Sequence, residues 1–266
     1  MKISLARKCH TFINKKVMDN YDLEKIDTRA SSSTDKEKTK EKTAKIIAEL
    51  DDLQNMLYAE SKHSILIVIQ GMDASGKDGL IRKVFGNLNP QGVTVHGFKQ
   101  PTPEELSHDF LWRVHSHAPA KGYIQIFNRS HYEDIIVTRV HKLIDDETAK
   151  KRMKAINDFE ELLVNHNNTQ ILKFYLHVSA KEQHERLEER IHDKTKQWKY
   201  NEQDFVEAAL RKEYVKAYED CFENCNKIPW TIVPADQNWY KEYIVADALY
   251  ATLTNLNMQY PGLKKS

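Results

Sequence analysis

The sequence predicts an α/β fold, in which a doubly wound, five-stranded parallel sheet is preceded by an N-terminal helical extension. From Ser64 onward, short apolar runs alternate with helical patterns. Continuous apolar runs suit parallel strands that are buried on both faces. Strands that alternate with helices are typical of βαβ units, which assemble into one open sheet. The expected strands are 65–69, 93–98, 123–127, 171–178 and 230–233.

The extension covers residues 1–62, and residues 63–266 form the main domain. Residues 1–35 are weakly patterned and end in a Ser-rich, loop-like stretch. From Asp35 to about Lys62, apolar residues recur every three or four positions, which indicates an amphipathic helix. We expect this helix to pack on the main domain or on another subunit.

The crossover segments carry helix-start signals. A Ser or Thr followed three positions later by Glu, the capping-box pattern, occurs at Thr102 and at Ser179. Thr102 is also followed by Pro103, and proline is favoured at the first helical position. The other expected helices run from Ser130 to about residue 141, from Asp145 or Asp146 to about residue 165, and over 201–226 and 238–256.

Composition excludes several classes of function. The chain of 266 residues has 40 Lys+Arg against 39 Asp+Glu, a net charge of +1, so nucleic acid is not an expected partner. A local basic cluster could still bind another polyanion. The first residues have no apolar region typical of a signal peptide, and apolar runs stay far below the roughly 20 residues that a membrane span needs. Three cysteines, an odd number, favour a reducing cytoplasm over a disulfide framework.

The cysteine and histidine pairs are not predicted to bind metal. Cys221 and Cys225 lie one helical turn apart, but no Cys or His follows at a zinc-like spacing, so we expect both thiols to pack. His115 and His117 are two positions apart and would not share a helix face. We expect surface or packing roles for them.

The first expected strand leads into Gly71-Met72-Asp73-Ala74-Ser75-Gly76-Lys77-Asp78. Its glycine spacing and lysine are those of a P-loop, whose backbone N–H groups and helix N-terminus bind phosphate. Asp78 stands where a Mg²⁺-binding Ser/Thr is usual, and Asp73 lies inside the loop. Two acids beside phosphates suggest that a cation accompanies the phosphates. We therefore predict a phosphoryl-transfer site with unusual metal ligation. A simple strand–turn–helix corner would use the glycines but would not account for the lysine.

The other strand ends should meet the P-loop, because ligands of such sheets bind beyond the carboxyl ends of the strands. Lys99 follows the second strand and is predicted to meet a phosphate chain, although one lysine could equally be solvated. The third strand ends in Asn128 and Arg129, where P-loop enzymes carry a metal-binding Asp. Arg129 suits phosphoryl oxygens.

Glu133 is predicted to compensate for the missing Asp at position 128 and to share Mg²⁺ with Asp73. Asp134 follows it directly. The alternative is that these two acids only supply favourable charge to the first turn of a helix.

A lid is predicted at about residues 183–200. Arg186 and Arg190 lie four positions apart and share a helix face, and Lys196 and Lys199 follow. Basic residues after the fourth strand suit a segment that closes over phosphates and excludes water. A charged surface helix would also show mixed Arg and Glu, and this alternative stays open on the residues alone.

Short blocks of sequence follow one another in order over about residues 40–256. They are GMDASGKDG (71–79), NPQG (89–92), FK (98–99) with Pro101, HDFLWR (108–113), FNRS (127–130), YE (132–133), RVH (139–141), LKF (172–174), LHVS (176–179), WK (198–199) and VPAD (233–236). In these blocks the chain resembles the family-2 polyphosphate kinases.

The resemblance implies a P-loop kinase-like fold and transfer of phosphate from inorganic polyphosphate to nucleotides, with Mg²⁺ or Mn²⁺. It indicates the subgroup that accepts AMP and ADP, or other purine nucleotides, and a homo-oligomer, either dimer or tetramer. His131 and Thr195 depart from the pattern, which puts nucleotide preference and lid behaviour in doubt. The implied roles are catalysis for Asp73, Lys77, Asn128, Arg129 and Glu133, polyphosphate binding for Lys77, Lys99, Arg129, Arg190 and Lys199, nucleotide binding for Gly76, Asp109, Arg113 and Arg139, and metal binding for Asp73 and Glu133.

Two other functions stay open on the sequence. An ATP-dependent nucleoside monophosphate kinase would share the fold, loop and lid, although the acids in the loop disfavour it. A non-catalytic regulator that binds polyphosphate or nucleotide would not need Lys77, Arg129 and Glu133 together.

Overall fold

The computed structural model describes residues 21–263. They contain a five-stranded sheet with the order β2-β3-β1-β4-β5, in which every neighbouring pair is parallel. Each expected strand is present, with small shifts at its ends. The strands are β1 (Ser64–Gln70), β2 (Val93–Gly97), β3 (Ile124–Asn128), β4 (Thr169–His177) and β5 (Trp230–Pro234). The predicted doubly wound α/β fold is confirmed.

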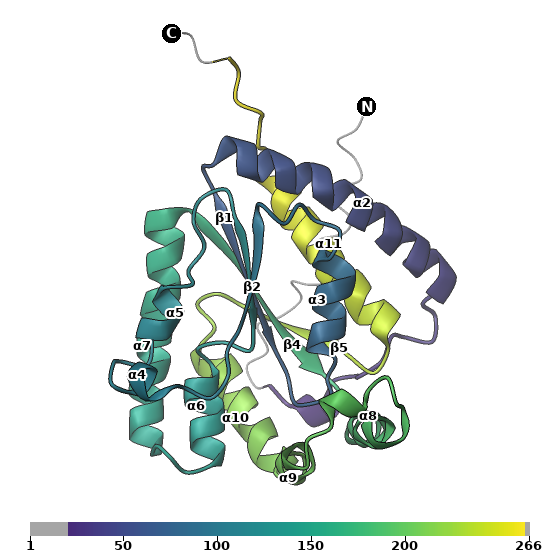
Figure 1. Cartoon of the computed structure of the whole chain (residues 1–266), viewed down its shortest axis with the longest axis vertical. Coiled ribbons are helices and arrows are strands. Elements are labelled where there is room, and N and C mark those ends of the chain that lie inside the picture. Colours follow the sequence, from purple (N-terminus) through teal and green to yellow (C-terminus); the bar gives the residue numbers. More distant parts are fainter. Residues whose placement is uncertain (1–20, 264–266) are drawn as a thin grey trace.

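Helices cover both faces of the sheet (Figure 1). Every residue of β1 is buried, and its side chains alternate between two cores. Ile65, Ile67 and Ile69 pack in one core, while Leu66 and Val68 pack in the other. This explains why the strand is a continuous apolar run. The first core includes α2 (Lys36–Glu60), α3 (Lys77–Phe85) and α11 (Asn238–Asn255), and the second includes α6 (Glu133–Val140), α7 (Asp146–Asn167) and α10 (Arg211–Asn224).

The N-terminal amphipathic helix forms as predicted and packs against α11 (Figure 1). Asp35 caps it by accepting a hydrogen bond from the Lys38 N–H. Residues 1–20 of the predicted loop-like segment lie outside the described part of the chain. Residues 21–35 contain the short turn η1 (Leu23–Lys25), and the Leu23 side chain is buried in the second core. This stretch therefore packs on the domain, which its weak pattern does not reveal.

Three helix predictions need correction. The helix expected over 201–226 is two helices, α9 (Gln203–Ala209) and α10, because the backbone at Leu210 departs from helical geometry. Ser130 does not begin α6. Its hydroxyl accepts the Gln70 side-chain amide and the Tyr132 N–H, and the helix begins at Glu133.

The third correction concerns the box at Ser179. The Ser179 hydroxyl caps α8 (Ala180–His192) by accepting the Glu182 N–H, but Glu182 binds Arg186 in place of the Ser179 backbone. Asp236 accepts the Ser179 N–H instead. The box at Thr102 is complete and starts α4 (Pro103–Leu106).

The cysteines and histidines that were not predicted to bind metal have packing contacts in the structure. Cys221 and Cys225 are buried in the second core, which confirms their packing role. His117 stacks on His96, whereas the His115 ring contacts Phe159. In the part of the chain that the structure describes, no helix is long and apolar enough to cross a membrane. The short elements are α5 (Trp112–His115) and η2 (Gln197–Lys199).

Candidate phosphoryl-transfer site

A groove of about 610 Å³ lies at the carboxyl edge of the sheet, where the P-loop, the ends of β2 and β3, α8 and α11 meet. Basic side chains outnumber acidic ones on its wall. The basic residues are Lys77, Arg82, Lys83, Lys99, Arg129, Arg186, Arg190, Lys196, Lys199 and Lys241. The groove therefore concentrates positive charge in a chain that is nearly neutral overall, which suits a polyanion.

The P-loop follows β1 and ends at Gly76, which precedes α3 and adopts φ +90°. Glycine is favoured there because a left-handed backbone strains other residues. The first N–H groups of α3 have no intrahelical acceptor and form the positive end of the helix dipole. The turn thus presents a helix N-terminus to the groove, as an anion site requires.

Side chains hold successive carbonyl groups of the P-loop. Lys77 donates to the Gly71 and Met72 oxygens at 2.7 and 3.1 Å. Gln183 donates to Asp73 O at 3.1 Å, and Arg186 donates to the oxygens of residues 74 and 75. Lys241 also donates to residue 75, at 3.2 Å. These bonds fix the orientation of the loop from both α8 and α11.

The lysine of the P-loop is itself buried. Burial and the nearby Arg129 charge lower the pKa of Lys77 to about 8, against the opposing effect of Asp73 and Glu133. Its ammonium lies in the groove wall while it also braces the loop. The sequence placed this lysine at the site but gave no sign of the bracing role.

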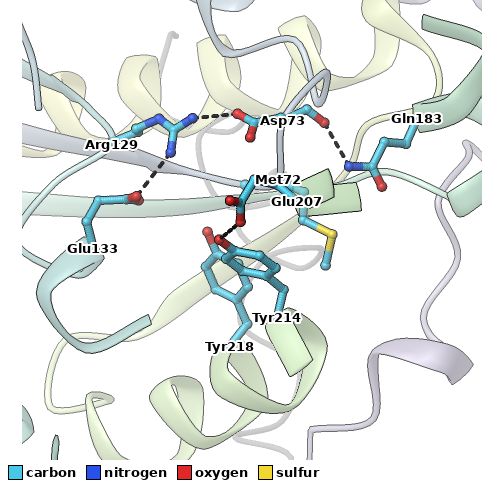
Figure 2. A pocket seen from close by; sticks show the side chains of 9 residues that line it. Met72, Asp73, Arg129, Glu133, Gln183, Glu207, Tyr214 and Tyr218 are labelled. Carbon is cyan, nitrogen blue, oxygen red and sulfur yellow. Dashed lines mark hydrogen bonds and ion pairs between the residues drawn. The ribbon is translucent and has the colours of Figure 1, made fainter. Parts of the chain in front are cut away.

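Arg129 lies between two carboxylates, as Figure 2 shows. Its guanidinium is 2.5 Å from Asp73 and 3.1 Å from Glu133. The Glu133 charge is the main reason that the pKa of Arg129 rises further above its ordinary value. Arg129 adopts φ +62°, an uncommon backbone conformation for a residue other than glycine. Asp73 and Glu133, the two acids predicted to bind metal, are therefore both paired with Arg129 in this structure.

Asp78 has protein partners too. It accepts hydrogen bonds from the Asn128 amide at 2.9 Å and from the Lys199 ammonium at 3.3 Å. Partial burial opposes a low pKa at Asp78, but these two partners outweigh it and lower the pKa. The second acid of the P-loop thus links the end of β3 to the predicted lid.

The predicted lid residues divide into two groups. Arg190 pairs with Asp204 of α9, and Lys196 lies 2.5 Å from Glu189, so these cations of the groove already have carboxylate partners. Arg186 faces the P-loop instead, and also donates to the Asp236 oxygen after β5. It serves as a brace under the loop.

The three remaining nucleotide-binding candidates do not line the groove. Arg113 is buried, donates to the Lys99 backbone oxygen and pairs with Asp134 at 3.0 Å. Arg139 lies between Asp146 and Asp220. Asp109 is exposed and accepts the Leu111 N–H. Their nucleotide contacts stay predictions, whereas Gly76 and Lys99 do line the groove.

A second, smaller pocket adjoins the pair of carboxylates. Arg129, Glu133 and Glu207 line it, with Tyr214 and Tyr218 from α10 (Figure 2). The Glu207 carboxylate accepts the Tyr214 hydroxyl at 2.6 Å. Among residues 21–263, no group of three or more His, Cys, Asp or Glu side chains is arranged to hold a metal by itself.

Sequence reasoning missed Lys241 and Gln183. Lys241 lies in the first turns of α11, directly after the last strand, so it reaches the same edge of the sheet as the P-loop. The signal that could have found it is its place soon after β5, because ligands of such sheets bind beyond the carboxyl ends of the strands. Gln183 has no such signal, because its amide reaches the loop only through the packing of α8.

Strand order, P-loop and cationic groove together define a P-loop phosphotransferase. Residues 33–261 match the model of a protein family described as polyphosphate kinase 2. The AMP/ADP-polyphosphate phosphotransferase of Meiothermus ruber is 43% identical over 245 residues, with 91% of each chain covered. The ADP-polyphosphate phosphotransferase of Rhodopseudomonas palustris is 40% identical, with 81% of this chain and 79% of that protein covered.

The solved structure of polyphosphate kinase 2 from Arthrobacter aurescens TC1 superposes with a TM-score of 0.90 at 37% identity. The match covers 94% of this chain and 91% of that one. The chain belongs to the polyphosphate kinase 2 family.

Proposed function

We propose that this protein transfers the terminal phosphoryl group of inorganic polyphosphate to AMP or ADP, and reversibly makes ADP or ATP. One observation carries the proposal: cations from the P-loop, from the segments that follow β2 and β3, and from the lid all line one groove. A linear polyanion can engage several of these cations at once, whereas a compact triphosphate reaches fewer. The relatives named for AMP/ADP and ADP acceptors support this choice of substrates.

The chemistry needs position and charge more than covalent help. Charge on the transferring phosphoryl group must be neutralised while the attacking and leaving oxygens are held in line. Lys77 and the N-terminus of α3 supply positive charge at the loop, and Arg129 supplies a planar fork for phosphoryl oxygens. Asp73 and Glu133 hold that fork from two sides, so it is oriented before substrate arrives.

The residues fit Mg²⁺, or Mn²⁺, bound together with the substrate. Mg²⁺ sites at phosphates use one or two carboxylates plus phosphate oxygens and water. Asp73 and Glu133 line the same pocket and supply two carboxylates. Among the described residues, no group of three or more ligating side chains could hold a metal without the substrate. Once bound there, the metal would neutralise phosphate charge.

A donor panel tests the proposal. With Mg²⁺ present, we expect polyphosphate to phosphorylate AMP and ADP far better than ATP phosphorylates AMP. Raising salt should weaken the apparent affinity for polyphosphate more than that for nucleotide, because a polyanion releases more counterions. If ATP phosphorylates AMP as fast as polyphosphate does, the protein is an ordinary ATP-dependent nucleotide kinase. If polyphosphate or nucleotide binds without turnover, the protein is a non-catalytic regulator.

Charge reversal sharpens the assignment. Arg190→Glu or Lys199→Glu should impair the use of polyphosphate and leave nucleotide binding nearly intact, because both cations line the lid side of the groove. Lys181→Glu is the matched control, since Lys181 lies on the same helix as Arg190 but is 86% exposed and outside the groove wall. A similar loss in all three variants would mean that only the overall charge matters.

A further inference from the structure

Lys241 is a buried lysine that the proposed chemistry has not used. Its side chain enters from α11, is 1% exposed, and donates one hydrogen bond to the Ser75 oxygen at 3.2 Å. It also lines the cationic groove. Within residues 21–263, no carboxylate lies within ion-pair distance of its ammonium. A buried ammonium without a counter-ion is costly, so its retention calls for an explanation.

The ammonium of Lys241 lies directly beside Gly76, in the turn that precedes α3. A Cβ atom placed on Gly76 would lie 2.2 Å from Lys241 Nζ, far inside contact distance. Position 76 favours glycine because of its positive φ, and the lysine ammonium occupies the space beside its Cα. The charge therefore lies at the helix N-terminus, where an anion is expected to bind.

The groups that face Lys241 do not neutralise it. The charges of Arg186 and Lys77 disfavour its ammonium, and those of Glu242 and Glu182 favour it. Glu182 is already bound to Arg186 at 2.9 Å. Burial and the two neighbouring cations together outweigh the acids and lower the pKa of Lys241 to about 7.

Lys173, another buried lysine of the chain, provides the contrast. Lys173 is fully buried in the core, and its ammonium pairs with Glu160 at 2.8 Å. It also donates to the Tyr132 hydroxyl and the Cys225 carbonyl, so all three of its N–H groups have acceptors. Lys173, buried in the core, thus has a full set of partners. Lys241 has one neutral acceptor.

We propose that Lys241 is a positioning residue of the phosphate loop, and that the phosphoryl groups of bound polyphosphate serve as its counter-ion. The inference rests on the proposed function and deepens it. In the free protein, Lys241 adds uncompensated charge behind Gly76. Bound polyphosphate, on the other side of the turn at Gly76, compensates the charge of Lys241. Part of the binding free energy therefore arises because the buried ammonium gains a counter-ion.

The proposal predicts opposite effects on stability and on binding. Lys241→Met keeps a similar shape and removes the buried charge, so the Tm of the free protein should stay level or rise. The Kd for long-chain polyphosphate, measured by calorimetry without nucleotide, should rise by roughly 10- to 100-fold, the range for losing one charged contact. The increase in Tm at saturating polyphosphate should shrink accordingly.

Lys241→Gln serves as the second variant, because its amide can still donate to Ser75 O while the charge is gone. Lys241→Gln should weaken polyphosphate binding as Lys241→Met does. If the Lys241→Met protein does not fold, Lys241→Gln is used in its place. Lys173→Met is the control for destabilisation alone, and it should lower the Tm while leaving the Kd for polyphosphate within about threefold of wild type.

The results separate this inference from the proposed function. If wild type does not bind polyphosphate, the proposed function fails and the inference falls with it. If wild type binds polyphosphate and both Lys241 variants keep its Kd within about threefold, the proposed function stands and the inference is overturned. Weaker binding in both variants, with Tm at or above that of wild type in the variant that folds, supports it.

Discussion

The ammonium of Lys199 lies 3.3 Å from the carboxylate of Asp78, so a residue of the lid is joined to the first turn of the helix that follows the P-loop. Both side chains line the groove. Polyphosphate that recruits Lys199 must compete with Asp78 for it. The pair therefore holds the lid cation close to the loop in the free protein and opposes its transfer to the substrate.

Asp78→Asn should tighten polyphosphate binding, because it removes both the competitor for Lys199 and a negative charge beside the phosphates. An exposed ion pair of this kind corresponds to a change of roughly 2- to 5-fold in Kd. The measurement is calorimetric titration with polyphosphate at fixed salt, without Mg²⁺. Asp52→Asn, an exposed change of the same charge on α2, is the control. Weaker binding in Asp78→Asn would show that the carboxylate helps to hold the ligand.

The central strands of the sheet, β1, β3 and β4, could be predicted closely because they are buried on both faces. That burial produces the continuous apolar run of β1 and the similar runs at β3 and β4, which local pattern alone reveals. The break at Leu210 could not be predicted, because residues 201–226 contain no Gly or Pro that would mark it. Boundaries set by tertiary contacts leave no local signal.

In the site too, features with a local sequence signal could be predicted and those set by tertiary contacts could not. The P-loop and Arg129 could be placed from the sequence, because they follow directly from strand ends. The partners of the acids could not, because Asp78 meets Lys199 across 121 positions of sequence. Asp73 and Asp78 suggested a bound metal, which stays a prediction, and the structure adds that each of these acids also has a cation of the protein as partner. Lys241 escaped notice for a similar reason, since it meets Ser75 across 166 positions.

Lys77→Ala should lower turnover by a factor on the order of 10² to 10⁴, the range for removing one preorganised electrostatic stabiliser. The fold should survive, although the loop loses donors to Gly71 and Met72. Steady-state rates with polyphosphate and ADP provide the test. Lys45→Ala, an exposed change on α2, should leave turnover unchanged. A Lys77→Ala protein with near-normal turnover would mean that the site has been assigned wrongly.

Glu133→Gln should raise the Mg²⁺ concentration that gives half-maximal rate, because it removes one of the two carboxylates proposed for the metal. Asp134→Asn should do so less, since Asp134 is buried against Arg113 and does not line that pocket. Rates are measured over a Mg²⁺ series at constant salt. An unchanged Mg²⁺ dependence in Glu133→Gln would remove Glu133 from the metal site and leave it as a partner of Arg129 only.

Lys173→Met should lower the free energy of unfolding by about 3–5 kcal/mol, because it leaves the buried carboxylate of Glu160 without its cation. Urea unfolding measures the change. Lys154→Met breaks an ion pair with Asp158 whose lysine is 80% exposed, and it should cost no more than about 0.5 kcal/mol. Equal stability of the two variants would contradict a structural role for the buried pair.

The last prediction concerns pH and compares wild type with Lys241→Met. The pKa of Lys241 is about 7 in the folded protein, against an ordinary lysine value of about 10.5 in the unfolded chain. Between these values the unfolded chain binds more protons at this position, so wild-type stability gains from rising pH. Below pH 7 the folded protein carries the full cost of the buried charge.

The difference in unfolding free energy between Lys241→Met and wild type should therefore be largest near pH 6.5 and shrink as the pH rises toward 9.5. One titrating group changes it by at most about 1.4 kcal/mol per pH unit. Groups far from position 241 titrate alike in both proteins, so the comparison reports on Lys241 and on the neighbours that its charge influences, among them Lys77. Urea midpoints taken at matched salt across this range measure the difference. A difference that is constant or grows with pH would mean that Lys241 is not held as an uncompensated ammonium in the free protein.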